Sequence, residues 1–133
     1  MSDDPNLKLL RNTYAEWGRG EFKRVDMFDP DVEFVQGGIE PQTYRGPDGV
    51  REGWFQWLAA WDDFRVEATE IIPGSEPDCY VVFVHLSGRG KESGVPTESE
   101  TANVIWLRDG KIRRMELHWD RQAALDAAGL ETT

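Results

Sequence analysis

The sequence is poor in residues that bind metals or form disulfides. It contains one cysteine, Cys79, and two histidines, His85 and His118. One cysteine cannot form an intrachain disulfide, and one cysteine with two histidines does not make a zinc-binding pattern. Phosphate-binding loops, dinucleotide fingerprints and nucleophile elbows are missing as well. We therefore expect no metal and no cofactor, and we expect a reducing compartment, the cytoplasm, as the location.

Basic residues and long apolar runs are also scarce. The chain has 15 Lys and Arg against 25 Asp and Glu, which gives a net charge of -10. Nucleic acids and anionic membranes bind basic surfaces, so neither is an expected partner. No apolar run approaches the roughly 20 residues of a membrane span. Residues 1–4 are acidic and polar, where a signal peptide has a basic start. These features predict a soluble cytoplasmic protein.

Aromatic residues, by contrast, are plentiful. The 133 residues include 6 Trp, 6 Phe and 3 Tyr, and hydrophobic residues make up 39% of the chain. A chain of this length and composition buries roughly two thirds of its unfolded surface on folding, which excludes disorder for its body. The sequence has no internal repeat and no linker. We therefore predict a single domain over residues 1–133.

The spacing of apolar residues predicts an α+β fold. Helices are expected where these residues recur every three or four positions, and strands where they alternate. The glycine-rich step at residues 18–20 separates the first two helices, and Asp109-Gly110 predicts a tight hairpin between the last two strands. Helices are predicted at residues 6–17, 21–28, 47–61 and 121–128, and strands at 32–36, 64–73, 79–89, 97–108 and 111–120. The last four strands are expected to form an antiparallel meander, and residue 44 is expected to lie in a loop or a short strand.

The strand at residues 79–87 is apolar on both of its faces. Tyr80, Val82 and Val84 alternate with Cys79 and Val81. If one face packs on helices, the other also needs a cover. We predict that a second copy of the chain supplies it, forming a homodimer through the convex face of the sheet, with a loop or tail as the alternative.

Four short motifs connect this pattern to a known family. They are DPDVE at residues 29–33, YRGPDGVR at 44–51, RDGKI at 108–112 and DR at 120–121. With these motifs the chain resembles the SnoaL-like branch of the NTF2-like superfamily, which includes ketosteroid isomerases, limonene epoxide hydrolase and polyketide cyclases. The resemblance implies a cone, in which a curved antiparallel sheet with two N-terminal helices wraps a long helix around a deep apolar cavity. It also implies a dimer.

The resemblance also points to candidate catalytic residues. His85 is expected to face the cavity and to exchange a proton near neutral pH. Asn103 corresponds to a pocket acid of the isomerases, and its amide could donate a hydrogen bond to an oxygen that gains charge. Tyr14 is one position from the isomerases' oxyanion tyrosine, and a core role is the alternative. The isomerases' catalytic aspartate falls near Gln36, where no carboxylate stands.

On the last strand the sequence departs from the family pattern. The hydrolases and cyclases have a catalytic aspartate where this chain has Leu117. A bulge of one residue would turn Glu116 or His118 inward, because a slip of one residue exchanges the faces of a strand. A shifted match to a His-Trp-Asp motif of the cyclases would use His118 and Asp120.

We expect an aromatic pocket with few charges. Its predicted lining, which suits a flat or polycyclic apolar ligand, is Trp17, Gln36, Trp54, Trp57, Phe83, Met115, Leu117 and Trp119. The sequence slightly favours a cofactor-free acid–base enzyme, of the isomerase, cyclase or hydrolase type, acting on a small apolar molecule. The alternative is a non-catalytic ligand-binding module or a dimeric scaffold.

Overall fold

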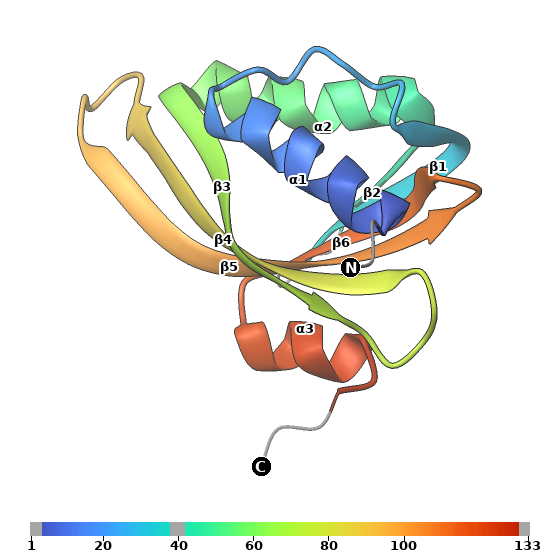
Figure 1. Cartoon of the computed structure of the whole chain (residues 1–133). Coiled ribbons are helices and arrows are strands. Elements are labelled where there is room, and N and C mark those ends of the chain that lie inside the picture. Colours follow the sequence, from blue (N-terminus) through green and yellow to red (C-terminus); the bar gives the residue numbers. More distant parts are fainter. Residues whose placement is uncertain (1–3, 38–41, 131–133) are drawn as a thin grey trace.

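A curved, mixed β-sheet with helices on both faces forms the fold (Figure 1). The computed structural model describes residues 4–37 and 42–130. Within these residues the sheet has six strands in the order β2-β1-β6-β5-β4-β3. The strands are β1 (Phe28–Gln36), β2 (Gln42–Arg45), β3 (Trp61–Pro73), β4 (Cys79–Gly90), β5 (Pro96–Arg108) and β6 (Lys111–His118). The helices are α1 (Pro5–Gly18), α2 (Gly46–Ala60) and α3 (Arg121–Ala127).

The predicted meander of four antiparallel strands is confirmed as β3 to β6. The prediction of a wholly antiparallel sheet is wrong, because β1 runs parallel to β6, with Phe34 opposite Met115. Alternation along a strand identifies the strand but not its partner. The chain order therefore could not reveal that the first strand pairs with the last.

The predicted helix at residues 21–28 is also wrong. This segment has no regular structure until β1 begins at Phe28. Its apolar residues Phe22, Met27 and Phe28 are nevertheless buried in the core. The Met27 carbonyl accepts a hydrogen bond from the Ile112 amide at 2.8 Å, so the segment joins the edge of β6 instead of closing helical turns. The apolar spacing thus reflected burial, and tertiary contacts overrode the helical pattern.

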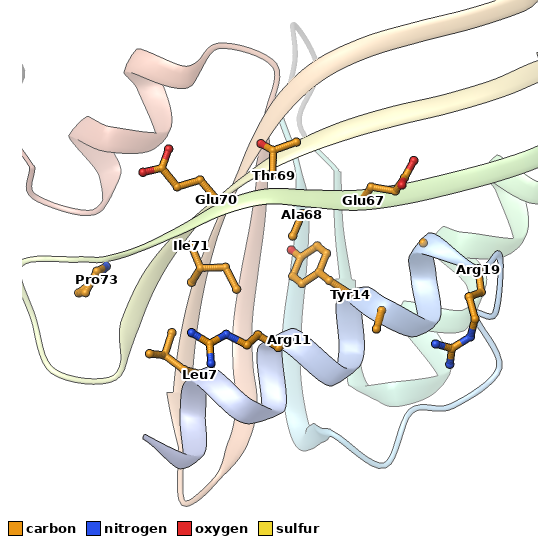
Figure 2. A pocket seen from close by; sticks show the side chains of 12 residues that line it. Leu7, Arg11, Tyr14, Arg19, Glu67, Ala68, Thr69, Glu70, Ile71 and Pro73 are labelled. Carbon is orange, nitrogen blue, oxygen red and sulfur yellow. The ribbon is translucent and has the colours of Figure 1, made fainter. Parts of the chain in front are cut away.

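Helices α1 and α2 cover the concave face of the sheet, whereas α3 lies on the opposite face (Figure 1). The Asp4 side chain caps α1 by accepting a hydrogen bond from the Asn6 amide at 2.9 Å. Helix α1 runs beside the edge strand β3 (Figure 2). Among the described helices, none combines the length and the apolar character that crossing a membrane requires.

Helix α3 packs on the outer face of the central strands. Ala124 and Ala128 close a small apolar cluster with β4 and β5 residues, namely Cys79, Val81, Ala102 and Val104. Burial raises the pKa of the Cys79 thiol to about 11, which keeps it neutral. The chain's own helix therefore covers part of the face that the sequence assigned to a second copy. The homodimer stays a prediction.

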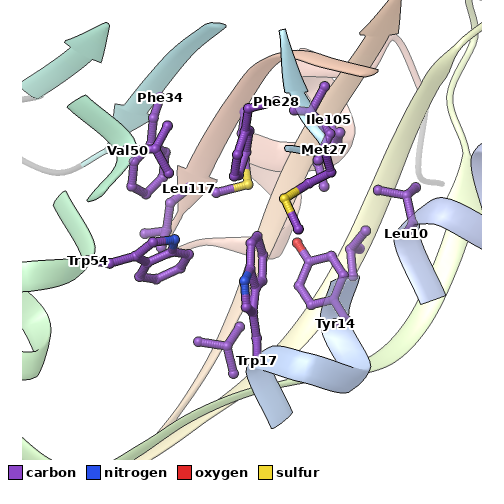
Figure 3. Close-up of a cluster of buried hydrophobic side chains, with 14 of the residues drawn as sticks. Leu10, Tyr14, Trp17, Met27, Phe28, Phe34, Val50, Trp54, Ile105 and Leu117 are labelled. Carbon is purple, nitrogen blue, oxygen red and sulfur yellow. The ribbon is translucent and has the colours of Figure 1, made fainter. Parts of the chain in front are cut away.

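Aromatic side chains fill the space between the helices and the sheet (Figure 3). Trp17 from α1 and Trp54 from α2 meet edge to face, with ring centroids 4.9 Å apart. Tyr14 and Phe22 pack against Trp17 from two sides. Such aromatic pairs stabilise a core beyond the area that they bury. The interior of the cone is therefore largely occupied by the protein's own rings.

Candidate functional site

A hydrogen bond between α1 and β5 lies in the middle of the interior. The Asn103 side-chain amide donates from Nδ2 to the Tyr14 hydroxyl oxygen at 2.6 Å. Both residues are almost fully buried, at 1% and 3% exposure. The structure thus places Asn103 inward, as expected, and brings it to Tyr14, which the spacing argument placed one residue out of position. The two residues form the polar centre of the candidate site.

The Tyr14 hydroxyl stays protonated. Burial raises its pKa above the ordinary value, and this effect outweighs the hydrogen bond from Asn103, which lowers it. Because the oxygen already accepts from Asn103, the hydroxyl proton remains available as a donor. Tyr14 can therefore donate a hydrogen bond to a bound oxygen but cannot act as a base near neutral pH.

Three buried polar atoms in this interior have no hydrogen-bond partner within the described residues. They are Gln36 Nε2, Thr101 Oγ1 and Asn103 Oδ1. Exchanging the oxygen and nitrogen of the Asn103 amide would let Tyr14 donate to Oδ1 but would leave Nδ2 unpaired instead. Most buried polar groups in proteins are paired, because an unpaired one destabilises the fold. For these three atoms the described chain itself supplies no hydrogen-bond partner.

The strand register brings these three groups to one face. Asn103 on β5 and Gln36 on β1 both lie opposite Leu117 of the intervening strand β6. Thr101 precedes Asn103 by two residues and therefore points to the same side of β5. Leu117, where the resemblance led us to expect a catalytic aspartate, thus faces inward and lies between the two amides.

An aromatic pocket of about 80 Å³ lies at the open end of this interior. Trp57, Trp61, Phe64 and Trp119 line it, together with Ser99, which precedes Thr101 by two residues. The rings of Trp57 and Trp119 contact each other in a tilted arrangement, with centroids 5.9 Å apart. Trp119 is held there by a hydrogen bond from Nε1 to the Gly37 carbonyl at 3.2 Å. Ser99 thus places the pocket on the same face of β5 as Thr101 and Asn103.

His85 lies on the opposite face of the sheet, so the expectation that it faces the cavity is wrong. On β4, Val82, Val84 and Leu86 pack into the main core, and His85 alternates with them. Its ring nitrogens contact Glu100 at 2.6 Å and Glu98 at 3.4 Å. Both faces of β4 are apolar near its centre, so periodicity could not decide which one meets the helices.

The remaining acid–base candidates also lie outside the interior. Glu116 and His118 point outward, because the register of β6 against β5 is regular from Ile105 to Ala102 and no bulge turns them. Glu116 Oε1 lies 2.9 Å from Nε2 of His118. Asp120 caps α3 by accepting from the Gln122 amide at 3.1 Å. None of the three meets Tyr14 or Asn103 in the described structure.

The predicted pocket lining divides into three groups. Trp57 and Trp119 line the aromatic pocket, and Gln36 faces the interior. Four residues face inward but are packed into the core, namely Trp17, Trp54, Met115 and Leu117. Phe83 points outward beneath the Arg121 guanidinium, 4.6 Å from its ring centroid, so its assignment to the pocket is wrong. The deep open cavity is thus replaced by a packed core with a small pocket.

Thr101 was not among the site residues predicted from the sequence. The sequence did contain a signal, because Thr101 lies two residues before Asn103 on a strand and must share its face. Threonine is common on exposed strands, and its burial depends on which face of β5 meets the helices.

Across the described ranges, no group of three His, Cys, Asp or Glu is arranged to hold a metal ion.

His85 gives the outer face a pH-dependent contribution to stability. Its hydrogen bond to Glu100 raises the pKa of His85, and the hydrogen bond to Glu98 acts in the same direction. A raised pKa in the folded state stabilises the protein fully below the unfolded value, about 6.5, and this stabilisation is lost as the pH rises through the folded pKa. We therefore expect a smaller fall in unfolding free energy between about pH 6 and pH 9 in His85→Asn than in the parent. Urea titrations at several pH values measure this, and Glu100→Gln should reproduce the effect. An unchanged pH slope in both variants would contradict the pairing.

Comparisons with known proteins agree with this architecture. Uncharacterized proteins of Mycobacterium tuberculosis and Mycobacterium bovis are 29% identical over 130 residues, which is 96% of this chain and 98% of theirs. An NTF2-like protein of unknown function from Burkholderia pseudomallei has a TM-score of 0.75 at 19% identity, covering 100% of both chains. TerC, co-crystallised with polyporic acid, has a TM-score of 0.74 at 23% identity, covering 95% of this chain and 99% of its own.

These structural likenesses establish the NTF2-like fold. A protein described as a SnoaL-like polyketide cyclase from Jannaschia sp. CCS1 also matches, with a TM-score of 0.75 at 16% identity over 99% of this chain and 98% of that one. The model of the SnoaL-like domain family matches residues 10–115, which is most of the sequence. With this match and the fold in agreement, the chain belongs to the SnoaL-like domain family.

Proposed function

We propose that this chain binds a small, largely apolar ring compound between α2 and the sheet, and that hydrogen bonds from the interior polar groups hold it. The observation that carries the proposal is the set of three unpaired buried atoms, on Gln36, Thr101 and Asn103. A buried polar group without a partner typically costs about 1–3 kcal/mol. A ligand that pairs these atoms would recover that free energy on binding.

The surroundings of these atoms define the class of ligand. Trp57 and Trp119 offer aromatic surface at the pocket, which suits a ring that packs against them. Thr101 and Asn103 are separated by about 7 Å along β5, as residues two apart on a strand are. The pocket of about 80 Å³ is small. Such a volume admits at most a single small ring, which would carry a hydroxyl or carbonyl oxygen at its inner end.

An acid–base enzyme is the second candidate. The hydrogen-bonded pair of Tyr14 and Asn103 favours it, because a hydroxyl and an amide at one point can stabilise an oxygen that gains negative charge. Proton transfer also needs a group that titrates near neutral pH. The inward positions carry amides at Gln36 and Asn103, and an amide binds a carbonyl without exchanging protons. Binding without turnover is therefore our preferred function.

Thr101→Val tests the proposal through stability and binding together. We expect the free protein to gain about 1 kcal/mol in unfolding free energy, because the variant removes an unpaired buried hydroxyl. Urea denaturation followed by circular dichroism measures this. A thermal-shift screen of hydroxylated and carbonyl-bearing ring compounds should yield ligands of the parent, and Thr101→Val should bind these more weakly.

The control is Thr43→Val, at an exposed position of β2. It should change stability by less than about 0.5 kcal/mol and leave ligand binding as it is. Loss of stability in Thr101→Val would mean that the hydroxyl is already paired. Full ligand affinity in that variant would exclude Thr101 from the site. Conversion of any bound compound, followed by mass spectrometry, would favour the enzyme instead.

A further inference from the structure

A second concavity, of about 620 Å³, lies outside the proposed site, between α1 and the edge strand β3 (Figure 2). Small residues create it, because Ala15 and Gly18 on α1 and Ala68 on β3 leave a gap between the two elements. Leu7 and Ile71 form an apolar wall at one end of this groove. The volume falls within the range of small-molecule sites.

Arg11 is the unusual residue of this groove. Its guanidinium extends toward Leu7 and Ile71 in the gap between α1 and β3 (Figure 2). Within residues 4–37 and 42–130 it has neither a hydrogen bond nor an ion pair. The other arginine of the lining, Arg19, lies at the far end and pairs with Glu21 at 3.1 Å. Arg11 thus presents five donors that nothing in the described chain uses.

The two acidic residues of the lining, Glu67 and Glu70, alternate outward along β3, although the Glu67 side chain also borders α1, with its Cγ 3.4 Å from where a Cβ on Gly18 would lie. Glu67 lies opposite His85 and Glu70 opposite Phe83, and both of these partners point outward. Figure 2 likewise shows the two carboxylates on the side of β3 away from α1. The part of the groove wall next to Arg11 that Leu7 and Ile71 form is apolar.

We propose that this groove binds an amphipathic monocarboxylate, with the carboxylate on Arg11 and the apolar chain lying between α1 and β3. A guanidinium pairs with a carboxylate through two parallel hydrogen bonds, so the two charges are complementary in geometry as well as in sign. The chain would run from Leu7 past Ala15 toward Gly18. This stretch of helix measures about 16 Å, so an extended acyl chain of medium length fits it.

The groove and the interior site are distinct. Tyr14 forms the wall between them, since its ring lines the groove while its hydroxyl accepts from Asn103 on the inner side. The groove ligand is an anion with a flexible chain, whereas the interior suits a neutral ring. Each of the two proposals can therefore be contradicted by experiment without contradicting the other.

Binding of dodecanoate, below its micelle concentration, tests the groove. Isothermal titration calorimetry should give saturable binding at one site, and amide shifts in NMR spectra should map to α1 and β3. Arg11→Gln keeps the aliphatic stem and removes the charge, so we expect about tenfold weaker binding of dodecanoate. Dodecanol, which lacks the carboxylate, should bind the parent and Arg11→Gln equally.

Two further variants complete the test. Arg19→Gln, the matched control at the other end of the groove, should bind dodecanoate like the parent. Ala15→Trp fills the groove from an exposed helix position and should abolish binding without unfolding the protein. Unchanged dodecanoate binding in Arg11→Gln or in Ala15→Trp would overturn the proposal. So would loss of binding in Gln36→Leu, because that residue belongs to the interior site alone.

Discussion

Trp17→Ala is expected to lower the free energy of unfolding by about 3–5 kcal/mol, the largest effect of any single substitution considered. Trp17 is 1% exposed and contacts aromatic rings from four segments of the chain, those of Tyr14, Phe22, Phe28 and Trp54. Removing the indole leaves a cavity that neighbouring rings cannot fill without leaving their rotamers. Urea denaturation followed by far-UV circular dichroism measures the loss.

The matched control is Phe55→Ala. Phe55 is 69% exposed on α2, so its truncation opens no cavity and should change stability by less than about 1 kcal/mol. If Trp17→Ala does not fold at all, Trp17→Leu gives the same comparison with a smaller loss. Equal effects at Trp17 and Phe55 would contradict the packed interior and favour an open cavity of the kind that the resemblance implied.

Tyr14→Phe should destabilise the protein by about 1–3 kcal/mol although it removes a single oxygen. Nδ2 of Asn103 would then lose its partner, and both polar atoms of this buried amide would be unpaired. Adding Asn103→Leu to Tyr14→Phe removes the unpaired amide, so the double variant should be more stable than Tyr14→Phe alone. Chemical denaturation of the two single variants and the double variant measures this coupling.

Tyr44→Phe serves as the comparison for this pair. The Tyr44 hydroxyl bonds to Gln42 and Gln56 at 2.9 Å, and both of these residues are exposed. Water can replace a lost partner there, so the loss should be smaller than at Tyr14. If the changes in unfolding free energy caused by Tyr14→Phe and Asn103→Leu are additive, the two side chains do not depend on each other. That result would contradict the hydrogen-bonded pair as the polar centre of the site.

The candidate site was partly predictable from the sequence. Asn103 was identified because an amide is unusual in the middle of a strand, and it does lie in the interior. His85 was misplaced because its strand is apolar on both faces near the centre, so its phase came from the resemblance. Thr101 was missed because threonine is common on exposed strands, although its position two residues before Asn103 implies that the two share a face.

By itself the sequence determined the family, the helices α1, α2 and α3, and the antiparallel meander. The helices and the meander depend on local periodicity and on turn residues such as Asp109-Gly110, which act within a few residues of the chain, whereas the family came from the resemblance of short motifs. The shortage of cysteine, histidine and basic residues likewise led us to expect no metal site and no nucleic-acid partner, because composition needs no coordinates.

Only the tertiary structure decided what the interior can do. It paired β1 with β6, turned residues 21–27 into an irregular segment, and set His85 outside and Asn103 against Tyr14. Each of these outcomes depends on contacts between residues far apart in the chain, which local patterns do not encode. The same contacts filled the expected cavity with tryptophan rings. They also left three polar atoms on the inner face of the sheet without hydrogen-bond partners among the described residues.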